Sequence, residues 1–448
     1  VNTSQYSRNG YYAFFLNDDF RVRRNLTLNL GLRYEVETPT VERFNRSSRG
    51  FDFTTASPIS AAATAAYARS PIPQVPASQF QVRGGLLFAG PDARKLYSTS
   101  KHNFSPRFGF AWTPPGTSKT VVRGGIGVFF FPNNLGGFGI DQPGFSVSTP
   151  LVSSQDGGLT PYATLSNPFP AGLQQATGSS LGIATLLGQG VSFTRQNVIN
   201  GYSVRWSFDV QRELPGNMVL EIGYIGNHGV HMPVNWNLNY VPVQYLSTKP
   251  TRDQATIDTL SGNVTNPFSG LIPGTGLNSS VIARQQLLLP YPQFTGVTQL
   301  TRPDGKLYFH ALDVRLEKRF SHGLHFLANY EFSKQLAATN RLNGQDPSPY
   351  KAIASESRPH SLVVSAGYEL PFGQGKPIGN TNNPVLSRII GGWSANAIYS
   401  GVSGSPLSWG NLIYLGGDLN SRPHNIDAAF DVTRFNRNSA DQLASNYR

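Results

Sequence analysis

The chain has 448 residues, of which only 14% are charged, and it is rich in Gly (46), Pro (32), Tyr (19) and Phe (28). A low charged fraction combined with many aromatic residues and glycines favours strands and turns over helices. The absence of cysteine excludes disulfides, thiolate metal sites and a cysteine nucleophile, and the net charge of +12 includes no run of five or more basic residues that would indicate nucleic-acid binding.

The first residues lack the basic and apolar regions of a signal peptide, which we interpret as a mature protein or an excised fragment. No stretch approaches the roughly 18 consecutive apolar residues that a transmembrane helix requires. These features exclude a helical membrane protein. They do not exclude a β-barrel, because its alternating strands keep the mean hydropathy modest.

Ten segments of the chain alternate between apolar and polar residues. In the second of them, for example, Leu26, Leu28 and Leu30 are separated by threonine and asparagine. Successive side chains of a strand point to opposite faces, so the pattern predicts strands with one apolar and one polar face and does not fit the helical period of 3.6. The predicted strands lie at about 11–20, 26–36, 104–113, 119–131, 201–213, 217–227, 307–320, 324–334, 360–370 and 392–401.

Short turns and long loops connect these strands in alternation. The strands are paired by tight turns at 21–25, 114–118, 214–217 and 321–323, and by a longer Gly/Pro/Asn-rich link at 371–392. Long, polar, irregular segments separate the pairs, at 37–103, 132–200, 228–305 and 335–359. Within them, only the Ala-rich stretch 59–68 has the composition of a helix.

The connections distinguish a membrane barrel from a soluble sandwich, which also has alternating strands. Compact soluble domains rarely contain a loop longer than about 15 residues, whereas outer-membrane barrels have short periplasmic turns and long outer loops. The sequence therefore predicts an all-β fold, a transmembrane antiparallel up-and-down outer-membrane β-barrel. We expect it to be partial, with about ten strands and long extracellular loops, because the stretch after Gly401 does not return to a strand.

Three hairpins of this sequence resemble those of a known family. Residues 12–22 and 26–35 resemble a hallmark hairpin of TonB-dependent receptors, and the closest resemblance is to the Oar-like group that is frequent in Acidobacteria. Residues 103–112 with 122–127, and 211–215 with 223–229, resemble further hairpins of these receptors. The resemblance implies that residues 1–448 are the β-barrel domain of a TonB-dependent transporter. The resemblance further implies that this domain is incomplete, an internal fragment without the plug and the C-terminal strands of a 22-stranded barrel.

The resemblance also implies a function. It predicts a receptor of the bacterial outer membrane that takes up a scarce ligand (a siderophore, oligosaccharide or peptide) and contacts outer-membrane lipid and lipopolysaccharide. Its energy would come from the TonB–ExbB–ExbD complex through an N-terminal region that these residues do not contain. No cofactor is expected. A passive porin and a surface-exposed structural or adhesion barrel are the alternatives, and a soluble all-β enzyme is a more distant one.

No catalytic or metal-binding constellation is recognisable in the sequence. The pairs His228/His231 and His322/His325 have a spacing that suits metal binding on a helix, but they fall at a loop entry and in a tight turn. We expect ligand capture by aromatic side chains of the long loops, which could stack on sugars or other flat ligands. These candidates are Trp236, Tyr240, Tyr245, Tyr291 and Trp409.

Charged residues fall on the polar faces of the predicted strands. In a barrel this face lines the lumen, and we expect its charges to form ion pairs that brace the wall and contact the plug. The predicted lumen-facing charges are Arg33, Glu35, Arg107, Arg123, Arg205, Asp209, Glu221, Asp313, Arg315, Glu317, Glu331 and Glu369.

Overall fold

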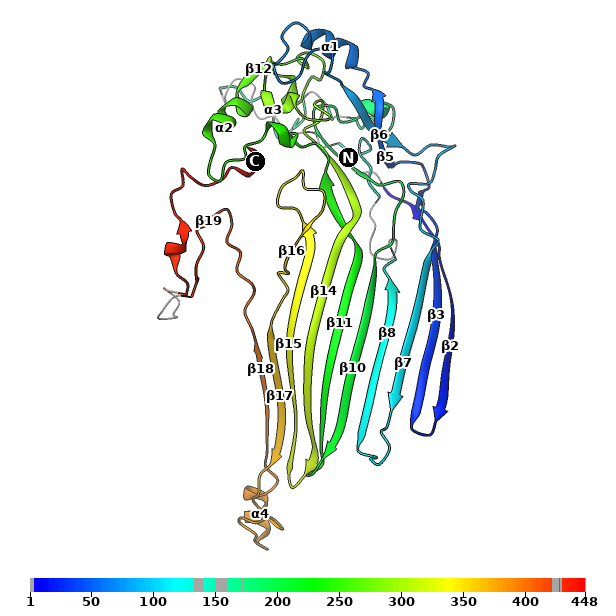
Figure 1. The fold of residues 1–448 in the computed structure, drawn as a ribbon, viewed down its shortest axis with the longest axis vertical. Coiled ribbons are helices and arrows are strands. Elements are labelled where there is room, and N and C mark those ends of the chain that lie inside the picture. Colours follow the sequence, from blue (N-terminus) through cyan, green and yellow to red (C-terminus); the bar gives the residue numbers. More distant parts are fainter. Residues whose placement is uncertain are drawn as a thin grey trace.

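A computed structural model describes residues 4–132, 140–147, 149, 151, 159–170, 172–173, 175–420, 427 and 429–447. Ten long antiparallel strands form one sheet in which each strand pairs with its neighbour in the chain (Figure 1). In the described sheet, β2 and β18 are the two open edges. The ten strands are β2 (Tyr11–Arg23), β3 (Leu26–Glu37), β7 (Asn103–Trp112), β8 (Thr120–Phe130), β10 (Tyr202–Leu214), β11 (Met218–Asn237), β14 (Gly296–Ser321), β15 (Leu324–Asn340), β17 (His360–Glu369) and β18 (Ser394–Val402). The prediction of an all-β, up-and-down antiparallel fold with these ten strands is confirmed.

Three strands are longer than the sequence pattern predicts. β11 continues to Asn237 instead of residue 227, β14 begins at Gly296 instead of residue 307, and β15 reaches Asn340 instead of residue 334. The pairing of β11 with β14 shifts register between Gly229 and Trp236. Each bulge inserts an unpaired residue and so interrupts the alternation of apolar and polar side chains. The outer part of the strand therefore lacks the sequence pattern that predicts a strand. At about 3.3 Å per residue, the extensions of β11 and β14 carry these strands roughly 35 Å past their predicted ends, and the extension of β15 adds about 20 Å.

Four of the five connections at one end of the sheet are short, and the fifth, between β17 and β18, is longer, as predicted. His322 and Gly323, between β14 and β15, both have positive φ (53° and 80°), the backbone of a two-residue hairpin turn that twists with its strands. The link between β17 and β18 contains a short helix, α4 (Pro384–Ile390). Asn383 caps this helix, because its side-chain oxygen accepts hydrogen bonds from the N–H groups of Val385 and Leu386 (3.0 and 3.2 Å).

Segments between the strand pairs fold into a packed layer at the opposite end of the sheet, which we call the cap (Figure 1). The prediction that residues 37–103 and 228–305 are irregular is therefore wrong. The cap contains the helices α1 (Ser60–Tyr67), α2 (Gln254–Ser261) and α3 (Arg284–Leu287) and the hairpins β5 (Ser48–Ala56)/β6 (Arg83–Phe88) and β12 (Asn263–Thr265)/β13 (Val281–Ala283). Helix α1 coincides with the Ala-rich stretch.

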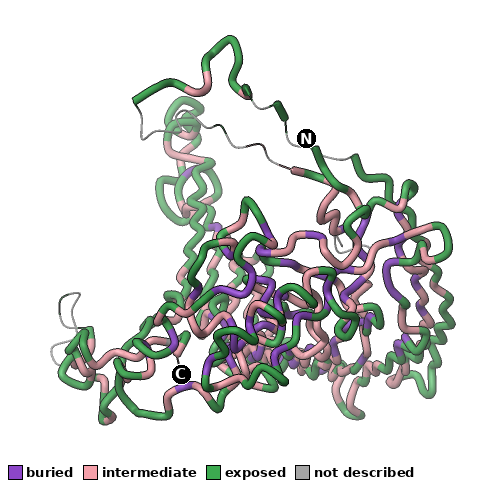
Figure 2. The backbone as a smooth tube through the Cα atoms, turned by 90° about the horizontal axis from the view of Figure 1, so that it is seen from above, coloured by how far each residue is buried: buried purple, intermediate pink, exposed green. Residues whose placement is uncertain are grey.

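Two clusters of buried apolar residues hold the cap together, and Figure 2 shows the buried segments gathered there. In the first cluster, Tyr67 of α1 stacks on Phe80 with ring centroids 3.9 Å apart, and its hydroxyl donates to the backbone oxygen of Val75 (2.6 Å). The second cluster surrounds Phe294, which is fully buried. Chain segments far apart in sequence supply these clusters, so no local pattern predicts them.

Short elements complete the described fold. β9 (Gly190–Thr194) lies parallel to the outer part of β14, and β16 (Tyr350–Ile353) pairs with β15. The remaining strands are β1 (Ser7–Arg8), β4 (Val41–Glu42), β19 (Ile413–Tyr414) and β20 (Phe435–Asn436), and the 3-10 helices are η1 (Gly182–Ala184), η2 (Val243–Tyr245), η3 (Gly276–Asn278), η4 (Val432–Arg434) and η5 (Ser445–Tyr447). Within the described residues, no helix is long and apolar enough to cross a membrane.

One face of the large sheet is a continuous belt of exposed apolar side chains. Strand register puts Phe208, Tyr224, Leu312 and Phe332 side by side on it, with exposed fractions of 41% to 50%. Leu30, Phe108 and Ile126 extend the same face toward β3. A monomer in water rarely exposes so large an apolar area, so this face requires an apolar surrounding.

Candidate ligand-binding site

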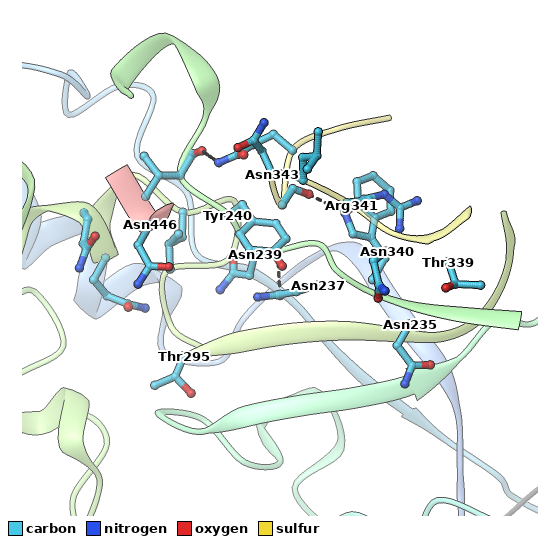
Figure 3. A pocket seen from close by; sticks show the side chains of 18 residues that line it. Asn235, Asn237, Asn239, Tyr240, Thr295, Thr339, Asn340, Arg341, Asn343 and Asn446 are labelled. Atoms are coloured by element: carbon cyan, nitrogen blue, oxygen red, sulfur yellow. Dashed lines mark hydrogen bonds between the residues drawn. The ribbon is translucent and has the colours of Figure 1, made fainter. Parts of the chain in front are cut away.

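A pocket of about 520 Å³ lies where the cap meets the outer ends of β11 and β15 (Figure 3). Its lining is dominated by primary amides. The outer end of β11 and the residues after it contribute Asn235, Asn237 and Asn239, and α3 contributes Gln285 and Gln286. Asn340 at the end of β15, Asn343 and Gln345 in the loop after it, and Asn446 near the end of the described chain supply the others.

Some of these amides have a structural task. The Asn239 Nδ2 donates to the backbone oxygens of Tyr291 and Phe294 (3.0 and 2.9 Å), and its Oδ1 accepts from the Tyr291 N–H (2.9 Å). The Asn237 Oδ1 accepts from the backbone N–H groups of Asn239 and Val297 (both 3.0 Å). These bonds join the end of β11 to the second buried cluster and fix the floor of the pocket.

Trp236 forms a rigid wall of the pocket. Its indole N–H donates to the backbone oxygen of Gly344 (2.7 Å), and the guanidinium carbons of Arg302 and Arg341 lie 4.2 and 4.5 Å from its ring centroid. The Asp304 carboxylate accepts from both arginines (2.7 and 2.5 Å), which places it between them. Cation–π contacts and charge-assisted hydrogen bonds therefore hold the indole in one orientation.

Tyr240 presents an open aromatic surface instead. Its side chain is 36% exposed, and the other side of the ring lies against Gly344. A Cβ at position 344 would come within 2.3 Å of the Tyr240 ring carbons, so only glycine allows this approach. The geometry leaves the Tyr240 ring available to a molecule in the pocket (Figure 3).

The other predicted ligand-binding aromatics lie elsewhere. The Tyr245 hydroxyl donates to the backbone oxygen of Gln74 (3.0 Å), and its ring packs against the first cluster. Tyr291 belongs to the second cluster, where burial raises the pKa of its phenol. Trp409 follows β18 and stacks on Phe435, with centroids 5.1 Å apart. Among the five candidates, the structure brings together Trp236 and Tyr240 and leaves the other three outside this pocket.

Sequence reasoning missed the amides. Asn235, Asn237 and Asn239 do alternate in the sequence, which is a weak signal of one lined face. Asn340 and Asn446 join them only through the fold. Asparagine is also common in turns, so its presence in a loop is not specific.

Strand register places all twelve predicted lumen-facing charges on the face opposite the apolar belt. One row runs across five strands from Arg123 through Asp209 and Asp313 to Glu331. Within the described part of the chain, the ion pairs that involve these twelve residues are Arg33–Glu35, Arg315–Glu317 and Glu369–Lys376. Others use neutral or aromatic partners. Arg123 donates to the side-chain oxygen of Gln211 (2.8 Å), and the guanidinium groups of Arg107 and Arg205 lie over the ring of Phe129 (4.7 and 5.3 Å).

The histidine pairs form no site. The His228 ring stacks on Tyr308 (4.6 Å between centroids), and His322 is a turn residue. Across the described residues, no group of three or more His, Cys, Asp or Glu side chains could hold a metal ion.

The model of the outer membrane beta-barrel domain family matches residues 1–445. The chain belongs to this family. In bacterial outer-membrane barrels the apolar face of the wall meets lipid and the polar face lines the lumen, so the apolar belt is the lipid-facing surface of this sheet. In such barrels the short turns lie in the periplasm and the long loops outside, so the cap and its pocket lie on the extracellular side.

Solved outer-membrane receptors are similar to this family member in structure. The ferric-catecholate import receptor Fiu of Escherichia coli is 10% identical, with a TM-score of 0.37, and the match covers 81% of this chain and 32% of the receptor. The ferripyoverdine receptor of Pseudomonas aeruginosa is 10% identical (TM-score 0.34; 82% and 27% covered), as is the outer-membrane transporter YddB of Escherichia coli (TM-score 0.34; 89% and 47%). This chain thus spans less than half the length of each. The comparison with curated proteins gives no match.

Proposed function

We propose that residues 1–448 are the barrel domain of a TonB-dependent transporter that takes up a scarce ligand through the outer membrane. The observation that carries the proposal is that the strands that line the pocket also carry the lipid-facing belt. The pocket is lined by the outer ends of β11 and β15, and the inner parts of the same strands carry Tyr224 and Phe332 of the lipid-facing belt. A ligand in the pocket therefore contacts elements that cross the membrane.

The energy for uptake would come from the TonB–ExbB–ExbD complex, through a region outside residues 1–448. The resemblance of the hairpin 12–35 to those of TonB-dependent receptors supports this part of the proposal. Lipid and lipopolysaccharide would cover the apolar belt. Whether the ligand is a siderophore, an oligosaccharide or a peptide depends on the residues that line the pocket.

The test is uptake by cells that express the complete receptor, with and without a functional tonB gene. The proposal predicts that a ligand accumulates only when TonB is present and that a protonophore abolishes accumulation. A passive porin would admit the ligand to the same extent in both strains. A structural or adhesion barrel would leave growth on every ligand unchanged after deletion of the gene, and either outcome would overturn the proposal.

A further inference from the structure

The pocket has no unbalanced charge to offer a ligand. Among its described lining residues, Arg341 is the single charged one, and its guanidinium donates to the Asp304 carboxylate and to the backbone oxygen of Asp346. Its side chain is only 6% exposed. Arg302, Arg341, Asp304 and Asp346 together carry no net formal charge. A charged ligand, such as an anionic iron chelate or a peptide with free termini, would lose hydration here without gaining a counter-ion.

Several amide atoms of the lining remain unused. The side chains of Gln285, Asn340 and Asn446 line the pocket and make no hydrogen bond within the described part of the chain. The Gln286 Nε2 donates to the backbone oxygens of Pro292 and Phe294, which leaves its Oε1 as an acceptor. A primary amide offers two donors and an acceptor, and a hydroxyl group is both donor and acceptor. Clustered free amides therefore match a ligand that carries many neutral hydroxyl groups.

Tyr240 adds an apolar, flat surface to this polar lining. Its ring is open on one side and supported by Gly344 on the other. The C–H face of a pyranose ring is apolar and nearly flat, while its edge carries hydroxyl groups. A sugar could therefore lie on the Tyr240 ring and direct its hydroxyls toward Gln285 and Asn340. The cavity volume of about 520 Å³ lies within the 300–1,000 Å³ typical of small-molecule sites.

We propose that this pocket binds a neutral oligosaccharide, with Tyr240 stacking on one sugar ring and the amides of Gln285 and Asn340 binding its hydroxyls. The inference rests on the proposed function, because it names the ligand class of the transporter's outer site. It assigns Trp236 a different role from Tyr240. Trp236 is a positioning residue whose ring is already covered by arginines.

The experiment measures binding to the complete receptor, purified in detergent, by calorimetry. The neutral probes are maltohexaose, cellohexaose, xylohexaose and mannohexaose, followed by an array of neutral glycans. The comparison probes are hexagalacturonate, which is anionic, ferric enterobactin, which is an anionic iron chelate, and an N-acetylated, C-amidated hexapeptide, which is neutral. We expect at least one neutral glycan to bind and the comparison probes not to compete with it.

Four variants locate the binding. Tyr240→Ala should weaken the glycan about tenfold, which corresponds to about 1.4 kcal/mol, and Tyr240→Phe should restore most of the affinity because the ring is kept. Gln285→Leu keeps the size but removes the amide, and it should weaken binding severalfold. Its matched control is Gln79→Leu, at an exposed cap position outside this pocket, which should leave binding unchanged.

Three results would overturn the inference. One is that no neutral glycan binds, and another is that a glycan binds equally well to the Tyr240→Ala and Gln285→Leu variants. The third is that ferric enterobactin or the capped peptide binds and loses affinity in these variants. Failure of the transport proposal looks different: glycan binding would follow the predicted pattern, but uptake would not depend on TonB.

Discussion

The assignment of the apolar belt to lipid can be tested at the centre of β10. Phe208 is the middle residue of this 13-residue strand, its side chain is 50% exposed, and its neighbours in the pairing are Gly124 and Tyr224. Ser207 is adjacent, is also exposed, and points to the opposite face. The pair Phe208→Arg and Ser207→Arg therefore introduces the same side chain on the two faces at the same depth.

The magnitude follows from the position. An arginine on the lipid face at the middle of the bilayer destabilises a barrel by about 2–4 kcal/mol. Half of the Phe208 side chain faces the surroundings, so its loss from lipid adds about 1 kcal/mol to this, taking 1.5–3 kcal/mol for a fully transferred side chain. We expect Phe208→Arg to lower the free energy of unfolding by about 3–5 kcal/mol. Ser207→Arg, in the lumen, should change it by about 0.5 kcal/mol or less.

The assay is guanidinium unfolding of the complete receptor in phospholipid vesicles, followed by tryptophan fluorescence and by the difference in gel migration between heated and unheated samples. The reasoning is refuted if the two variants are equally stable. It is also refuted if Phe208→Arg is as stable as the unmodified protein, which is the result expected for an exposed residue of a soluble sheet. A reversed order, with Ser207→Arg the less stable, would mean that the two faces have been exchanged.

Three further changes test the cap. Tyr67→Ala removes a ring stacked on Phe80 and should destabilise the cap by about 3–5 kcal/mol, seen as faster proteolysis within the cap while heat-modifiable migration of the barrel persists. Asp304→Ala leaves the buried Arg341 without its carboxylate partner, so the protease resistance of the loop after β15 should fall. Asp304→Asn retains a hydrogen-bond acceptor and should lose less of this protease resistance. An equal loss in both variants would contradict the role of the charge. The backbone N–H and the hydroxyl of Thr55 donate hydrogen bonds to the Asp52 carboxylate, and these bonds hold the pKa of Asp52 below its ordinary value of 3.8. Its contribution to stability is therefore complete above about pH 4 and is lost as the pH falls through the depressed pKa, and the Asp52→Asn variant should show a flatter acid-unfolding profile in this range.

The strands were predictable because their physics is local. Leu26, Leu28 and Leu30 alternate with polar residues since one face meets lipid and the other meets the lumen, and this relation needs no knowledge of the rest of the chain. The outer end of β11 escaped prediction because bulges between Gly229 and Trp236 shift the alternation. The regular part of the sheet is thus visible in the sequence, and its irregular continuation is not.

The candidate site was only partly predictable for a different reason. Trp236 and Tyr240 stand out as aromatics in a polar segment, but the pattern cannot distinguish a ring covered by Arg302 and Arg341 from a ring that is open. The amide lining depends on contacts between β11, α3 and the end of β15, which are distant in sequence. Tyr291 illustrates the same limit, because the apolar residues that bury it come from several loops.

The way the end of the described chain returns to the cap constrains the order of folding. Tyr447 packs against the first buried cluster, and its backbone oxygen accepts from the N–H of Ser247, while Asp441 does the same for Arg252. These hydrogen bonds connect the segment between β11 and β14 with a segment that follows β18, so they close loops of about 200 residues. Such closures come late, because their entropy must be offset by contacts that are already in place. During refolding into vesicles we expect heat-modifiable migration to appear first and protease resistance of the cap afterwards, so that the strands insert before the extracellular cap is ordered.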